Sequence, residues 1–61
     1  MKISRSMNLS DLQERMGPTA TEAEADKMRD LLVDGYDGMD TRDIPEYLWI
    51  DMLDQAQIEA R

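Results

Sequence analysis

The chain has 61 residues, and its 14 acidic against 7 basic side chains give a net charge of −7 at pH 7. It contains no cysteine and no histidine, which excludes disulfides, thiolate metal sites and nucleophiles that depend on a histidine base. Nucleic-acid binding needs a basic surface and anionic membranes repel acidic proteins, so we expect neither as a direct ligand.

The first ten residues, MKISRSMNLS, contain no long apolar run, so they resemble neither a signal peptide nor a membrane span. Together with the missing cysteines this favours an intracellular protein. Ile3 and Met7 can dock on the helices that follow, or the segment can pair as a short strand with residues 38–40. The sequence leaves both arrangements open.

The first helix is predicted over residues 9–16, where apolar residues recur at helical spacing (Leu9, Leu12, Met16). Asn8 or Ser10 can cap its start, and Ser10 with Gln13 fits a capping box. Gly17 is expected in the left-handed position that ends a helix, and the proline that follows it prevents continuation.

The second helix is predicted over residues 21–33, because Thr21 and Glu24 form a capping box ahead of an apolar stripe (Ala25, Met28, Leu31, Leu32). The third is predicted over residues 45–59, where Pro45 suits a first turn. Its broad apolar face (Leu48, Trp49, Met52, Leu53, Ala56) is expected to complete the core, with Trp49 at the centre. The fold class is therefore all-α: one compact three-helix domain with an N-terminal extended segment or strand.

An acidic, glycine-containing loop is predicted between the last two helices, over residues 34–43. We considered a calcium loop, but no register places acidic ligands and glycine as an EF-hand requires. Carboxylate catalysis needs a pocket that tunes a pKa, and so short a chain offers little burial. We therefore expect no metal, no cofactor and no enzymatic activity. Ordinary solvated surface explains the residue types, since each Asp-Gly pair is also common turn chemistry.

The distribution of charge favours a binding function over plain solvated surface. Residues 1–20 carry a net charge of +1, whereas residues 22–54 carry −8. Such self-repulsion destabilises a small domain, while a one-signed field steers association with a basic partner. The predicted partner-binding residues are acidic side chains of this region with two tyrosine anchors: Asp30, Asp34, Tyr36, Asp37, Asp40, Asp43, Glu46 and Tyr47.

Four stretches in order resemble a known family: an opening MKIS, a first helix ending in Met16-Gly17, the segment ATEAEADKM, and the pattern DTRDIPEYLW at residues 40–49. This order is similar to small phage-encoded anti-CRISPR proteins that act on type I systems, particularly the type I-E group. The resemblance covers residues 1 to about 55. The stretch LLVDGYDGMD and Pro45 depart from it, which puts the subtype and subunit bound in question.

The resemblance implies a non-enzymatic inhibitor in the bacterial host cytoplasm. Its partner is expected to be a basic surface of a type I CRISPR-Cas effector, either the Cascade surveillance complex or the recruited nuclease-helicase Cas3. The expected mechanism is occlusion of target DNA by the acidic surface. Alternatives are an inhibitor of another nucleic-acid-processing host protein, a helical homodimer joined through Met28, Leu32, Trp49 and Met52, and a small divalent-metal protein.

Overall fold

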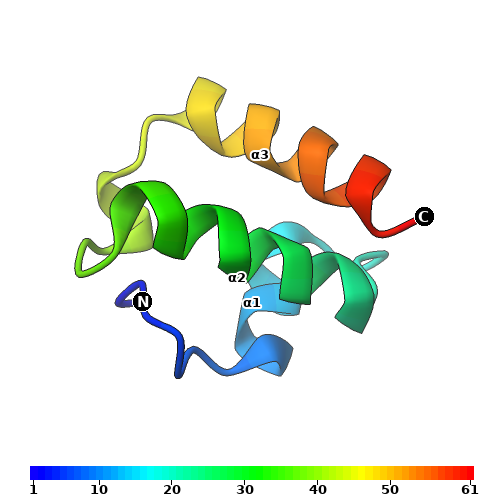
Figure 1. Ribbon diagram of the computed structural model, residues 1–61, viewed down its shortest axis with the longest axis horizontal. Helices are drawn as coiled ribbons and strands as arrows, with labels where there is room; N and C mark the ends of the chain where they lie inside the picture. The colour runs from blue at the N-terminus through cyan, green and yellow to red at the C-terminus, as the bar shows by residue number, and fades with distance from the viewer.

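The computed structural model describes residues 1–61 and confirms the predicted all-α fold of three helices (Figure 1). Helix α1 spans Leu9–Met16, α2 spans Glu22–Tyr36 and α3 spans Glu46–Glu59, with one 3₁₀ turn, η1, at Thr41–Asp43. Helices α1 and α3 each pack against α2, the longest of the three. None of these helices has the length and apolar character needed to cross a membrane.

The helix starts follow from capping side chains. Asn8 caps α1, accepting from the backbone N–H of Asp11 (3.2 Å). Thr21 and Glu24 form the predicted capping box of α2, with hydrogen bonds of 2.8 and 3.1 Å. The other predicted capping box is wrong, because Ser10 lies inside α1 and Gln13 Nε2 donates to Ala20 O instead (3.1 Å).

Helix α2 continues three residues beyond its predicted end, so residues 34–36 are helical and the loop is shorter than expected. The extension is stabilised by Tyr36, whose half-buried side chain packs against the core and outweighs the poor helix propensity of Gly35. The chain then reverses through a type II turn. Asp37 has φ −54° and ψ 133°, Gly38 has φ 86°, and Met39 N–H donates to Tyr36 O (3.1 Å).

Alanine substitutions at the two glycines should have opposite effects. Gly35 lies in a helix with open space around its Cα, so Gly35→Ala is expected to raise the free energy of unfolding by about 0.5–1 kcal/mol. Gly38 has a positive φ, so Gly38→Ala should lower it by about 1–2 kcal/mol. Urea unfolding followed by circular dichroism measures both. Destabilisation by Gly35→Ala would mean that α2 ends where the sequence predicts.

The N-terminal segment adopts both arrangements that the sequence leaves open. Lys2 forms an isolated antiparallel bridge with Asp40, Ile3 N–H donates to Met39 O (2.7 Å), and Gly38 N–H donates to Ile3 O (2.9 Å). This pairing turns the side chain of Ile3 into the core, where it is fully buried, and Met7 is only 7% exposed. The segment therefore closes the open end of the helical domain.

The core is centred on four fully buried side chains, Ile3, Leu12, Met28 and Leu32. Ala25 and Ala56 are buried beside them and let α2 and α3 approach closely. Trp49 does not take the central place predicted for it, because it lies at the edge of this cluster and is only half-buried. Ala56 is the one buried residue of α3, so α3 contributes little fully buried surface.

Candidate acidic interface

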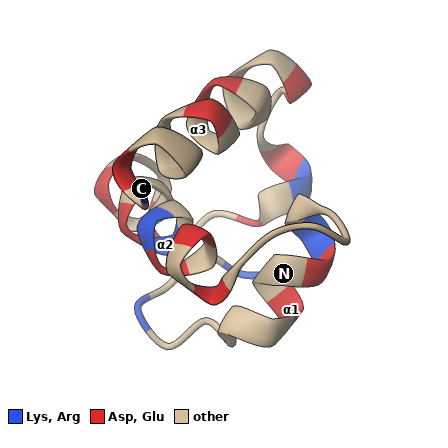
Figure 2. Ribbon diagram, turned by 90° about the vertical axis from the view of Figure 1, so that its right-hand side faces the viewer, with Lys and Arg blue, Asp and Glu red and all other residues tan.

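The eight predicted binding residues extend from the last turns of α2 to the first turn of α3. Asp30, Asp34 and Tyr36 belong to α2; Asp37 follows it directly. The remaining four lie farther along the chain, two at the ends of η1 and two at the start of α3: Asp40, Asp43, Glu46 and Tyr47. Figure 2 shows acidic residues on α2, on α3 and on the segment between them.

Three of the eight are engaged within the molecule. Asp30 accepts from Nη1 of Arg5 in an exposed ion pair. Tyr36 is half-buried against the core. Asp40 accepts more hydrogen bonds from within the molecule than either of the other two residues.

Asp40 is the junction between the N-terminal segment and η1. Its Oδ1 accepts from the backbone N–H of Arg42 (2.9 Å), from Arg42 Nε (3.3 Å) and from the ammonium group of Met1 (3.0 Å). These hydrogen bonds, that of the Arg42 backbone first, hold the pKa of Asp40 well below its ordinary value of 3.8. The hydrogen bond from the Arg42 side chain to Asp40 raises the pKa of Arg42. Asp40 therefore has a structural role, with few of its lone pairs left for a partner.

Removing this carboxylate should reduce stability in a pH-dependent way. We expect Asp40→Asn to lower the melting temperature by a few degrees at pH 7. Because the pKa of Asp40 is depressed by folding, its stabilisation is present above about pH 4 and is lost as the pH falls through the folded-state pKa. The difference in melting temperature between wild type and Asp40→Asn should thus shrink below pH 4. Asp37→Asn, which removes an exposed carboxylate of the same loop that forms no ion pair, is measured beside them as the control.

The other five predicted residues are exposed, and none of their carboxylates forms an ion pair within 4 Å: Asp34, Asp37, Asp43, Glu46 and Tyr47. The Tyr47 side chain is 68% exposed. No group of three carboxylates is arranged to hold a metal ion. Exposed carboxylates without an ion pair can receive lysine and arginine side chains of another protein.

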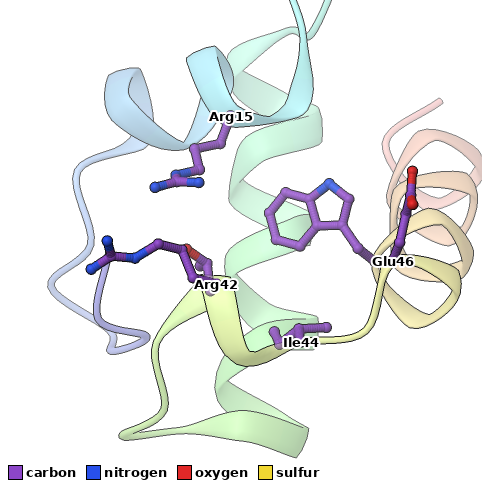
Figure 3. A pocket seen from close by; sticks show the side chains of 6 residues that line it. Arg15, Arg42, Ile44 and Glu46 are labelled. Carbon is purple, nitrogen blue, oxygen red and sulfur yellow. The ribbon is translucent and has the colours of Figure 1, made fainter.

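A cavity of about 240 Å³ opens between α1 and the start of α3, and sequence reasoning did not anticipate it (Figure 3). Its lining combines two cations with an indole: Arg15, Thr41, Arg42, Ile44, Glu46 and Trp49. In Figure 3 the guanidinium groups of Arg15 and Arg42 lie toward one side and the carboxylate of Glu46 toward the other. Asp40 already binds Arg42, and Asp43 adds to the negative field there. The cavity thus offers little uncompensated positive charge.

Sequence reasoning also missed the outward side of α3. Ile50 and Ile58 are 49% and 64% exposed, and the carboxylates of Asp51 and Asp54 are exposed as well. The sequence contained one indication of this outward side, because apolar residues occur on every side of the helix. A helix with a single buried face carries them on one side only.

Comparison of the chain with protein family models, curated proteins and solved structures finds no match.

Proposed function

We propose that the protein inhibits a type I CRISPR-Cas effector by binding a basic surface of the Cascade surveillance complex and blocking its access to target DNA. One observation carries the proposal. Residues 22–54 hold a net charge of −8, and four exposed carboxylates between residues 34 and 46 form no ion pair within 4 Å. An acidic surface that is not balanced internally is best explained by an external basic partner.

The proposed mechanism is competition with DNA for a basic channel. Duplex DNA presents regularly spaced phosphate charges to the proteins that bind it. Exposed carboxylates along residues 34–46 offer the same sign of charge to the same lysine and arginine side chains. Such contacts mainly accelerate association and weaken as salt screens them. The similarity of the DTRDIPEYLW segment to anti-CRISPR proteins of the type I-E group supports this choice of partner.

A DNA-binding assay tests the proposal. Purified type I-E and type I-F surveillance complexes are incubated with target duplex, with and without the protein, at two salt concentrations. We expect loss of target binding that is relieved at high salt. If DNA binding is unchanged but target cleavage by the recruited nuclease-helicase stops, the protein blocks recruitment rather than DNA access. If neither step changes, the proposed function is wrong.

A further inference from the structure

The outward side of α3 is unusually apolar for a surface that nothing in the molecule covers. The inward side packs against α2 through one buried and several half-buried residues (Leu48, Trp49, Met52, Leu53, Ala56). A helix advances 100° per residue, so a second set lies on the opposite side. We call this set the α3 outer face: Tyr47, Ile50, Asp51, Asp54 and Ile58.

The α3 outer face combines three exposed apolar side chains with two aspartates. Tyr47, Ile50 and Ile58 are 68%, 49% and 64% exposed, so about half or more of each is available to a partner. Tyr47 and Ile50 are three residues apart and can act as one pair of anchors. Ile58 lies two turns farther along, with Asp54 between, and the three apolar side chains span about 16 Å of the helix.

Single exposed apolar residues are normal on protein surfaces. Here three of them lie on one face of α3, which holds only four other large apolar or aromatic side chains. Such a concentration is typical of a surface that binds a partner.

Charge identifies the chemistry of that partner. Asp51 and Asp54 lie among the apolar anchors, and Glu46 is exposed one residue before Tyr47. We propose that the α3 outer face docks on another protein at an apolar surface that presents lysine or arginine side chains to Asp51 and Asp54. The inference rests on the proposed function, in that it names the apolar element by which the acidic surface engages the effector complex.

A second copy of this chain fits the face poorly. A two-fold dimer that pairs Tyr47 with Ile58 of its partner copy runs the two helices antiparallel, with the axis near residues 52–53. That register sets Asp51 of one copy against Asp54 of the other, twice. Like charges so placed are repulsive, and both chains carry a net charge of −7.

Glutamine substitutions test the docking surface without disturbing the fold. Ile50→Gln and Ile58→Gln alter exposed side chains, so their melting temperatures should stay within about 2 °C of wild type. Ala23→Gln is the control, because Ala23 is exposed on α2 and lies outside both residues 34–46 and the α3 outer face. Affinity is measured for the purified type I-E surveillance complex. We expect each isoleucine variant to bind about 10-fold more weakly and Ala23→Gln to change affinity less than about 2-fold.

Two outcomes of this assay separate the inference from the proposed function. If the complex binds wild type and both isoleucine variants equally, the α3 outer face is not part of the interface, although the proposed function stands. If the complex does not bind wild type, the proposed function fails and a peptide titration decides the inference.

The peptide titration uses a helical peptide with a leucine stripe flanked by lysines, and a second peptide with glutamine in place of each leucine. Backbone amide chemical shifts of the protein are followed by NMR. Shifts confined to α3 outer-face residues, seen with the leucine peptide and reduced by Ile50→Gln, support the inference. Shifts centred elsewhere, or equal effects of both peptides, overturn it. Concentration-dependent sedimentation that Ile50→Gln abolishes also overturns it, in favour of a second copy.

Discussion

Truncation of Leu32 to alanine is expected to unfold a large fraction of the protein. The Leu32 side chain is fully buried at the centre of the core, on the helix that contacts both others. Leucine-to-alanine changes at such positions cost about 2–5 kcal/mol. A 61-residue domain at ~0.05–0.15 kcal/mol per residue has only about 3–9 kcal/mol in total. The melting temperature should fall by more than about 10 °C in a circular dichroism melt.

The neighbouring leucine provides the control for this experiment. Leu31 undergoes the same chemical change on the same helix but is only half-buried. We expect Leu31→Ala to cost about 1–2 kcal/mol, in proportion to the apolar area it removes from contact. Equal losses for the two variants would contradict the placement of Leu32 at the core centre.

Helical periodicity was sufficient to predict the three helices, but it could not rank their apolar residues by burial. Trp49 is the largest apolar side chain, and size alone suggested the core centre. In the structure Trp49 is only half-buried, whereas Ile3 is fully buried in an N-terminal segment held by hydrogen bonds to residues 38–41. Those contacts join residues more than 30 positions apart, and local patterns carry no information about them. The end of α2 was mispredicted for a similar reason, since Tyr36 gains its packing only in the folded molecule.

The acidic character of the candidate interface was readable from composition, but the availability of each carboxylate was not. Asp34 and Asp40 look equivalent in sequence, as members of one run of aspartates. In the structure Asp34 is exposed, while Asp40 accepts hydrogen bonds from Met1 and Arg42. Asp30 is likewise paired with Arg5, which is 25 residues away. Charge counting therefore overestimated the number of carboxylates free to meet a partner.

Reversing the three free aspartates of the candidate interface is expected to abolish inhibition. The variant Asp34→Lys, Asp37→Lys and Asp43→Lys changes exposed side chains without ion pairs, so the fold should persist. Each reversal replaces an attraction of roughly 0.5–1 kcal/mol by a comparable repulsion. Together they should weaken binding to the type I-E surveillance complex by about 100-fold or more. A binding titration at low and high salt measures the two affinities. The difference in affinity between wild type and the variant should be smaller at high salt, because screening weakens both the attraction and the repulsion.

A second triple variant distinguishes the effect of where the charges are reversed from the effect of the total charge. Asp11→Lys, Glu14→Lys and Glu59→Lys also reverse exposed carboxylates, and both triple variants change the net charge from −7 to −1. If recognition depends on residues 34–43, this control should keep most of its affinity and lose only the part due to long-range steering. Equal loss in both variants would mean that the partner responds to overall charge alone. If the Asp34, Asp37 and Asp43 variant inhibits normally, these carboxylates do not contribute to binding. Residues 34–43 are then ordinary solvated surface.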